Sequence, residues 1–145
     1  MAEKKPQTFA NHARFDPLFH FFVIPVFALS TLAAIILFFW HPSLRSAWQF
    51  VLLAAGTVAV LKIRLYALRV QDRVIRLEER LRLTSLSQEP FRSRIPELTE
   101  GQLIASRFAA DAEAPKLAER ALAEKLSPAD IKKSIQTWRP DYWRV

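Results

Sequence analysis

The longest uncharged apolar run constrains this chain most. It extends over 24 residues, from Pro17 to Trp40, and contains no Asp, Glu, Lys or Arg. At about 1.5 Å per residue, a helix of this length rises roughly 36 Å, more than the roughly 30 Å hydrocarbon core of a bilayer. Asp16 can cap free backbone amides, and Pro17 suits the first helical position, where its missing N–H costs nothing. Residues 17–40 therefore predict a transmembrane helix.

This first helix is expected to be retained rather than cleaved. A signal peptide has an apolar region of about 7 to 15 residues, followed by small residues at its cleavage site. The run here is longer and closes on the bulky side chains Phe38, Phe39 and Trp40. Residues 1–16 then form a cytoplasmic N-terminal segment. Pro25 is expected to kink the helix, because it has no N–H to donate to the carbonyl four residues earlier.

A second helix is predicted from residue 47 to residue 86, because this stretch contains no proline and only one glycine, Gly56. Nearly every side chain up to Leu61 is apolar, whereas seven residues between Lys62 and Arg82, both included, are basic. Lys and Arg are enriched where membrane helices enter the cytoplasm. The change in composition therefore predicts a boundary between lipid and water within one helix.

The uncharged part of the second helix is only about 15 residues, which is short for a membrane crossing. Lys62 and Arg64 can extend it, because long basic side chains reach from the last apolar turn to the headgroups. Ser43 or Ser46 can cap its start, and Ser46 with Gln49 has the spacing of a capping box. The predicted boundaries are a periplasmic turn over 41–46, a transmembrane helix over 47–66 and a charged cytoplasmic helix over 67–86.

The distribution of basic residues predicts the orientation of this hairpin. Three precede the first span, one (Arg45) lies near the turn, and seven follow the apolar part of the second span. Because cytoplasmic flanks are the basic ones, both termini are expected in the cytoplasm. The cations nearest the second span are expected to contact anionic lipid headgroups: Lys62, Arg64, Arg69 and Arg73.

Beyond the second span, apolar residues recur at alternating steps of four and three. This spacing traces one stripe along a helix and is typical of a short coiled-coil seam. The stripe needs a cover, which the C-terminal part of the chain, a second copy or a different protein can supply. Ion pairs with i,i+4 spacing are also expected, Asp72 with Arg76 and Glu78 with Arg82. Ile63 and Ala67 begin the stripe, and its candidate interaction residues are Val70, Val74, Leu77 and Leu81.

The remainder of the chain predicts a small helical module. Residues 87–97 are expected to be a linker, and residues 98–145 a bundle of short helices that are marginal without mutual packing. The predicted helix starts are Thr99 with Gln102, Pro115, and Ser127 with Asp130; Ile131, Ile135 and Trp138 are expected along one side of the last helix. The fold class is therefore all-α, with a transmembrane hairpin whose second helix extends into the cytoplasm.

Aromatic side chains gather at the C-terminus, where Trp138, Tyr142 and Trp143 lie within a few residues of Arg139 and Arg144. They can complete the small core of the module. Alternatively, they can contact a partner or the membrane interface, because Trp, Tyr and Arg dominate binding hot spots. We include the three aromatic residues among the candidate interaction residues.

The charge of the chain, +7 with a pI of about 10.2, permits binding to nucleic acid. Much of it follows an apolar span, however, so attraction to anionic lipid explains it more simply. The chain also has no cysteine, which excludes disulfides and thiolate ligands within it. We therefore expect a lipid bilayer and a protein as partners, and we disfavour nucleic acid.

No pattern of catalytic residues is present, so no enzyme activity is predicted. The chain has two glycines, too few for the usual phosphate-binding loops, and the two predicted spans carry no carboxylate that would couple transport to ions. His20 and His41 lie near opposite ends of the first span, too far apart to share a metal. A role for either one in a cofactor-containing complex is a third hypothesis. We predict no catalytic, cofactor-binding or metal-binding residues.

Three segments carry a family resemblance. They are residues 11–17 (Asn-His-Ala-Arg-Phe-Asp-Pro), residues 64–80 (RLYALRVQDRVIRLEER) and residues 138–142 (Trp-Arg-Pro-Asp-Tyr). With them the chain resembles a family of uncharacterised small bacterial membrane proteins. The resemblance implies a protein of the bacterial inner membrane with two spans, and it supplies no activity or cofactor. The expected function is that of a membrane-anchored interaction or accessory subunit, with assembly through residues 63–81 or the module. The alternatives are peripheral binding of anionic lipid or nucleic acid by the basic part, and the cofactor-containing complex.

Overall fold

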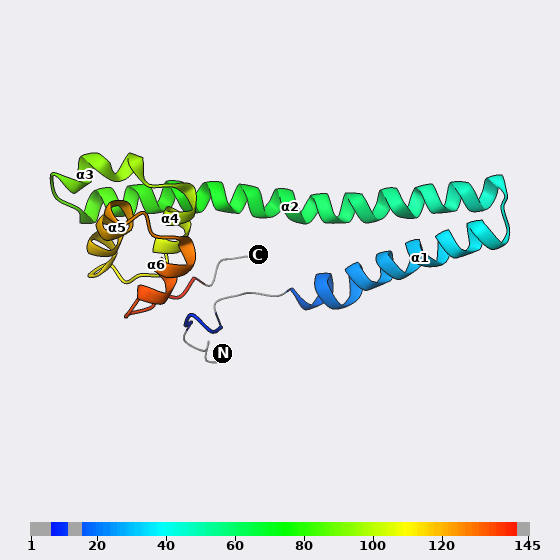
Figure 1. The fold of residues 1–145 in the computed structure, drawn as a ribbon, viewed down its shortest axis with the longest axis horizontal. Coiled ribbons are helices and arrows are strands. Elements are labelled where there is room, and N and C mark those ends of the chain that lie inside the picture. Colours follow the sequence, from blue (N-terminus) through cyan, green and yellow to red (C-terminus); the bar gives the residue numbers. More distant parts are fainter. Residues whose placement is uncertain (1–6, 12–15, 142–145) are drawn as a thin grey trace. The chain divides into compact units, whose positions relative to one another are not determined.

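The computed structural model describes residues 7–11 and 16–141, and every regular element within these ranges is helical (Figure 1). The described residues contain no strand, and only Ala109 and Trp138 form an isolated antiparallel bridge. The predicted all-α class is therefore confirmed. The elements are η1 (Phe19–Val23), α1 (Ile24–Trp40), α2 (Leu44–Leu86), α3 (Phe91–Arg94), η2 (Ile95–Glu97), α4 (Glu100–Ser106), α5 (Ala114–Ala123) and α6 (Pro128–Ser134).

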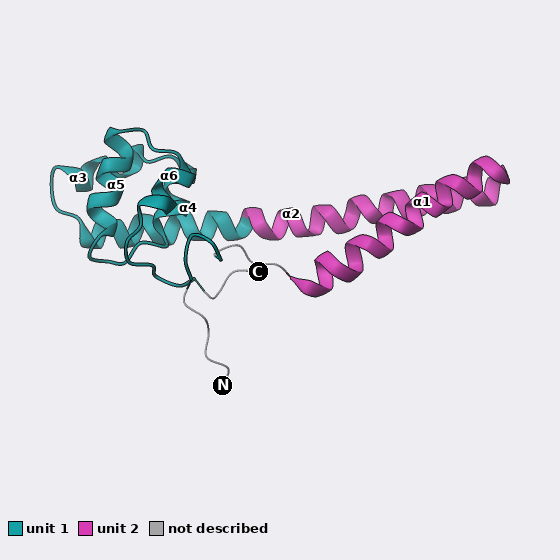
Figure 2. Cartoon of the chain, turned by 60° about the horizontal axis from the view of Figure 1, so that its bottom comes forward, with its two compact units in different colours: residues 1–14, 70–144 teal, residues 15–69, 145 magenta. Residues whose placement is uncertain are grey.

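The chain divides into two compact units, each described here by itself (Figure 2). Residues 15–69 form what we call the hairpin unit, which contains η1, α1 and the first part of α2. Residues 70–144, together with residues 1–14, form what we call the module unit, which begins within α2. The boundary between the two units along the chain therefore falls inside α2, a continuous helix of 43 residues.

The first helix of the hairpin unit begins as the sequence predicts. The backbone N–H of Phe19 donates to Oδ1 of Asp16 at 3.2 Å, so Asp16 caps the helix. Ahead of Pro25 the helix widens into the π-helical turn η1, in which the N–H of Ile24 donates to the carbonyl of Phe19. The irregularity that Pro25 was expected to introduce thus coincides with a π turn, a recognised way to absorb a break in the hydrogen-bond ladder.

The turn between α1 and α2 is shorter than predicted. The second helix begins at Leu44 and not at residue 47, because the Ser43 hydroxyl accepts from the Ser46 backbone N–H at 3.1 Å. Ser46 lies within the first turn of the helix, and its own hydroxyl donates to the His41 carbonyl at 2.9 Å. The capping box predicted for Ser46 and Gln49 therefore does not form, since an earlier serine takes that role.

Small and polar side chains bring the two helices of the hairpin unit together. The hydroxyls of Thr31 and Thr57 lie 2.9 Å apart, and the Thr57 hydroxyl also donates to the Leu53 carbonyl. The Phe27 ring lies so close to Gly56 that an added Cβ would come within 2.8 Å of a ring carbon. The small surface around Gly56 is therefore a point of close approach between the helices.

Both long helices are apolar on their outer surfaces. An 18-residue window of Phe19–Trp40 has a mean hydropathy of 2.6, and one of Leu44–Leu86 has 1.8, so each helix is long and apolar enough to cross a membrane. Large apolar side chains on them are exposed. They include Phe21, Leu29, Phe39, Trp40, Leu44 and Trp48.

The module unit builds one hydrophobic core against the last turns of α2. Its largest fully buried side chains include Phe108, Leu83, Leu103 and Ile131. Leu83 belongs to α2, whereas the other three come from the short helices or the segments between them. The short helices therefore fold onto α2 and share its core, which supplies the mutual packing that they lack in isolation.

Residues 87–97, predicted as a linker, belong to this core. They contain α3 and η2, and Phe91 and Ile95 are buried with Leu98. The prolines that predicted a linker instead confine the helical segments to one short turn each. The prediction failed because isolated apolar residues between prolines carry no periodic signal.

Local sequence signals place the starts of the remaining helices. Thr99 and Gln102 form the predicted capping box, and the Ser127 hydroxyl accepts from the Asp130 N–H. Pro115 lies in the first turn of α5, as predicted. The last helix, however, ends at Ser134. Ile135 is extended and Trp138 follows the helix, so both reach the core from a returning segment rather than along one helical side.

Candidate interaction surface

An apolar strip on α2 remains uncovered. It consists of Val70, Val74, Leu77 and Leu81, whose exposed fractions are 64%, 48%, 60% and 65%. These are the interaction residues predicted from the stripe on α2, and they lie on one face of the helix because their spacing alternates between four and three. We call them the strip.

The module packs against the opposite face of α2. Ile75, Glu79 and Leu83 are the buried residues of the helix, and they lie at spacings of four. At 100° per residue, this row lies on the other side of the helix from the strip. The described part of the C-terminal module, one of three covers expected from the sequence, therefore leaves the strip largely exposed, with only Val74 at the edge of a groove that it forms with α2.

Charged residues flank the strip. Arg73 and Glu78 are both exposed, on opposite sides of the strip, and neither forms an ion pair with another described residue. The pair predicted between Glu78 and Arg82 does not form, because the Arg82 side chain turns toward the module. Arg76 likewise pairs with Glu100 of α4 and reaches only the backbone carbonyl of Asp72.

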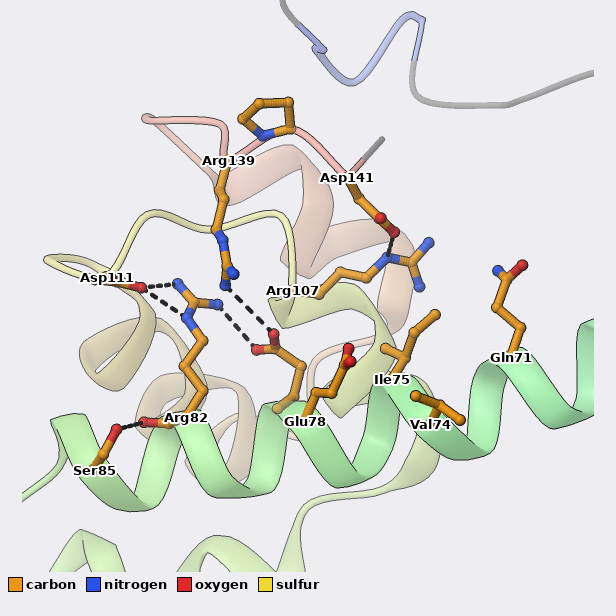
Figure 3. A pocket seen from close by; sticks show the side chains of 12 residues that line it. Gln71, Val74, Ile75, Glu78, Arg82, Ser85, Arg107, Asp111, Arg139 and Asp141 are labelled. Carbon is orange, nitrogen blue, oxygen red and sulfur yellow. Dashed lines mark hydrogen bonds and ion pairs between the residues drawn. The ribbon is translucent and has the colours of Figure 1, made fainter. Parts of the chain in front are cut away.

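A cluster of ion pairs joins the buried face of α2 to the module (Figure 3). Nη1 of Arg82 lies 3.0 Å from Oε2 of Glu79, and its Nη2 lies 2.7 Å from Oδ1 of Asp111 and 2.6 Å from the Ala109 carbonyl. Nη1 of Arg139 approaches Oε1 of Glu79 at 3.8 Å. One arginine thus connects α2 to the segment between α4 and α5.

A second ion pair ties the C-terminal segment of the module. Arg107, which is 7% exposed, pairs through Nε with Oδ2 of Asp141 at 3.1 Å and stacks over the Phe108 ring at 4.3 Å. The backbone N–H of Asp141 donates to Oε1 of Gln7 at 2.7 Å, and Nε2 of Gln7 donates to the Asp141 carbonyl at 3.3 Å. Segments from near the two ends of the chain are therefore hydrogen-bonded within the module unit.

These charges line a groove of about 770 Å³ between α2 and residues 139–141. Val74 and Glu78 lie at its side on α2, whereas Arg82 and Arg107 occupy its interior (Figure 3). Three of the four carboxylates that line the groove, those of Glu79, Asp111 and Asp141, pair with its arginines, and only that of Glu78 does not, so its charge is largely balanced. The groove therefore carries no strong preference for an anion or a cation.

Burial raises the pKa of the Glu79 carboxyl above its ordinary value of 4.5, and Arg82, Arg139 and Arg107 counteract the rise only in part. The side chain is 4% exposed, so its charged form has lost nearly all contact with water. A buried carboxylate is expensive even when paired. The module therefore holds a carboxyl group whose ionisation opposes folding.

This shift predicts a pH-dependent stability. Because the folded pKa of Glu79 lies above the unfolded one, the free energy of unfolding should fall as the pH rises between these two values. The contribution is fully present below about pH 4.5 and is lost above the folded pKa. Glu79→Gln should remove this part of the profile, measured by hydrogen exchange of α4 and α5 in detergent. The control is Glu78→Gln, at the exposed neighbouring residue, which should leave the pH dependence of stability unchanged. An unaltered pH dependence in Glu79→Gln would contradict its assignment to Glu79.

The predicted aromatic residues divide between the core and the part of the chain that is not described. Trp138 packs against the core with its ring centroid 5.1 Å from that of Phe108. Backbone bonds from Arg139 to Phe108 and from Ala110 to Thr137 hold this segment in place. Trp138 therefore completes the core, one of the two roles expected for it. Tyr142 and Trp143 lie outside the described residues.

The cations predicted to contact lipid all lie along α2. Nζ of Lys62 lies 5.9 Å from the centre of the Tyr66 ring, and the Arg64 guanidinium lies 5.5 Å from that of Phe19. Arg69 and Arg73 are exposed. Arg64 therefore contacts Phe19 at the start of the first helix, within the hairpin unit.

Two histidines, His20 and His41, lie among the described residues. Nδ1 of His20 lies 2.7 Å from the backbone carbonyl of Asp16. Among the described residues, no group of three or more His, Asp or Glu side chains could hold a metal ion. The structure thus assigns His20 a local contact at the start of the first helix.

Comparison with known families settles the membership of this chain. A model of a family of unknown function, DUF6526, matches residues 1–145. The chain belongs to this family. The resemblance to a family without assigned function is thereby confirmed. No curated protein and no solved structure matches the chain. What this DUF6526 protein does must therefore be argued from its surfaces.

Sequence reasoning missed the ion-pair cluster of this DUF6526 protein. The sequence pattern predicts a pair between Arg82 and Glu78, and it predicts no contact for Glu79, Asp111 or Asp141. The partners that join Glu79 and Arg82 in the cluster, Asp111 and Arg139, lie 32 and 60 positions after Glu79 along the chain. The one local signal for Glu79 was its place in a row with the apolar Ile75 and Leu83, at spacings of four.

Proposed function

We propose that this chain is a non-enzymatic, integral protein of the bacterial inner membrane that acts as an interaction or accessory subunit. The observation that carries the proposal is the exposed strip on α2, on the face away from the module. Fully burying one Val or Leu side chain stabilises an assembly by about 1.5–3 kcal/mol. Contiguous exposed apolar residues on a folded unit are typical of a binding surface.

A hairpin in the membrane with both termini in the cytoplasm is part of the proposal. The hydropathy of both long helices and the basic residues that follow the second span support it. The two hydrogen bonds between Gln7 and Asp141 add support of a different kind. Residues in direct contact lie on the same side of a bilayer, so the segments at both ends belong to one compartment.

Contact with anionic lipid would accompany this function. Lys62, Arg69 and Arg73 are exposed and have no ion-pair partner among the described residues. Each cation near an anionic membrane surface contributes about 1 kcal/mol. We propose that these side chains hold the emerging part of α2 close to the membrane, in support of the interaction and not as a separate activity.

The proposal is tested by purifying the full-length chain from its native membrane in mild detergent. We expect it to resist carbonate extraction and to migrate as a complex larger than one chain. Val70→Asp with Val74→Asp should reduce the complex to a single chain, because two carboxylates would then lie in an apolar interface. Ser85→Asp with Gln88→Asp, which alters exposed neutral residues beyond the strip, is the control and should leave the complex intact.

Two results would contradict the proposed function. Release of the wild-type chain by carbonate would contradict its place in the membrane. An unchanged complex size in the Val70→Asp, Val74→Asp variant would show that the strip is not the interaction surface.

A further inference from the structure

We infer that the strip binds the same strip on a second copy of this chain, as a parallel, in-register two-stranded coiled coil. The inference deepens the proposed function, on which it rests, by naming the partner. It is carried by the register of the strip, by the charges beside it and by the continuity of α2.

The register places the strip at the seam positions of a heptad. With Val74 at position a, Leu77 occupies d, Leu81 the next a and Val70 the preceding d. A β-branched residue at a with leucine at d favours two strands; Val74 with Leu77 meets that preference, whereas Leu81 at a and Val70 at d do not. The module occupies the opposite face through Ile75, so it leaves the seam open to a second helix.

The charges beside the strip are complementary between two copies. In this register Arg73 is at position g and Glu78 at position e of the following heptad. These positions lie next to each other across a parallel two-stranded coil, so Arg73 of each copy meets Glu78 of the other. Both side chains are exposed and neither has an ion-pair partner among the described residues. A symmetric dimer would therefore contain two equivalent pairs between Arg73 of one copy and Glu78 of the other.

Membrane insertion supplies the direction and the register. The strip follows the apolar segment directly along the chain, within the continuous helix α2 from Leu44 to Leu86. Two copies inserted with the same orientation present their strips in parallel and at the same depth. The strip covers only about two heptads, which is short for an isolated coiled coil. Confinement to one bilayer raises the effective concentration and offsets this shortness.

Disulfide crosslinking tests the geometry, because the chain contains no cysteine of its own. In a parallel, in-register coil each seam residue meets its own copy. Val74→Cys and Leu77→Cys should therefore each form a disulfide dimer in native membranes under mild oxidation. Arg69→Cys, next to Val70 but off the seam, is the matched control and should remain mostly monomeric. A disulfide that forms only between Val70→Cys and Leu81→Cys chains would indicate antiparallel helices and overturn the inference.

Charge exchange tests whether the partner is a second copy. Arg73→Glu and Glu78→Arg each replace two attractive pairs by two repulsive ones. Each substitution should lower the crosslinking of Leu77→Cys about tenfold, because each of the two attractive pairs lost and each of the two repulsive pairs gained weakens the dimer by roughly a factor of two. Combining both substitutions restores opposite charges and should restore crosslinking. A different protein as partner would keep its own charges, so the double variant would fail as badly as the single ones, and the inference would be wrong.

These outcomes separate the inference from the function on which it rests. The chain can stay in the membrane, in a complex sensitive to Val70→Asp, and yet give no disulfide at Val74→Cys or Leu77→Cys. That result would support the proposed function and contradict the homodimer. Release of the chain from the membrane by carbonate would contradict the proposed function, whatever disulfides form.

Discussion

Leu83→Ala should cost about 2–5 kcal/mol of the free energy of unfolding of the module unit. Leu83 is 0% exposed and contributes the side chain of α2 at the centre of the core. Replacement by alanine removes apolar contacts and leaves a cavity, because the helix backbone at this position cannot move into the core. We expect hydrogen exchange in α4 and α5 to accelerate accordingly, since these helices pack in the same core.

The matched control lies two residues away on the same helix. Leu81 is 65% exposed, and Leu81→Ala makes the same chemical change with the same effect on helix propensity. At dilutions where the detergent-solubilised chain is monomeric, it should alter the unfolding free energy by no more than about 0.5 kcal/mol. Similar losses for Leu81→Ala and Leu83→Ala would contradict the assignment of the two faces of α2.

Arg82→Met should cost about 3–5 kcal/mol at neutral pH, the cost typical of removing one partner from a buried ion pair. The Arg82 side chain is 11% exposed and bridges Glu79 to Asp111. Without it, the buried Glu79 carboxylate keeps Arg139 at 3.8 Å as its ion-pair partner. The loss should shrink as the pH falls, because a protonated Glu79 needs no counter-charge. Denaturant unfolding followed by exchange of α4 peptides measures it.

Two further variants separate the ion pair from general effects of losing an arginine. Arg80→Met alters an exposed arginine on the same helix and should change the unfolding free energy by less than about 0.5 kcal/mol. Arg82→Met combined with Glu79→Leu should recover most of the loss, because both charges are then replaced by apolar groups. A double variant no more stable than Arg82→Met would show that the uncompensated Glu79 charge is not the cause.

Leu83 and Arg82 both lie where α2 joins the module, and this joint shapes the proposed function. The module packs against one face of α2 through Leu83 and through the ion pairs that involve Glu79. It thereby leaves Leu77 and Leu81, on the other face of the helix, exposed. Damage to the joint should therefore unfold the module while leaving the strip in place, whereas damage to the strip should leave the module folded.

Local contacts explain why most helix starts could be predicted. The Thr99 and Gln102 capping box and the Ser127 cap join residues three positions apart, so their geometry depends on little beyond the chain nearby. Asp16 caps the first helix over the same short distance. The errors follow the same logic. Ser43 displaced the predicted start near Ser46, since two serines offered equivalent local bonds and only the turn distinguished them.

The sequence by itself determined the long elements of this protein. A 24-residue run without charge and a 43-residue helix without proline admit few structures, because backbone groups inside an apolar stretch must bond to each other. It also determined that an apolar stripe follows the second span. It did not determine which side of α2 would be buried.

Only the tertiary structure decided that side. Ile75 and Leu83 are as apolar as Val74 and Leu77, but the charged Glu79 lies between them in their row, so local periodicity favours the strip, the row that the module leaves exposed. The choice depends on the shape and charge of residues up to 60 positions away, where Asp111 and Arg139 meet Arg82 and Glu79. Burial follows from contacts between distant segments, and a periodic pattern records only that a side chain can be buried, not what will cover it.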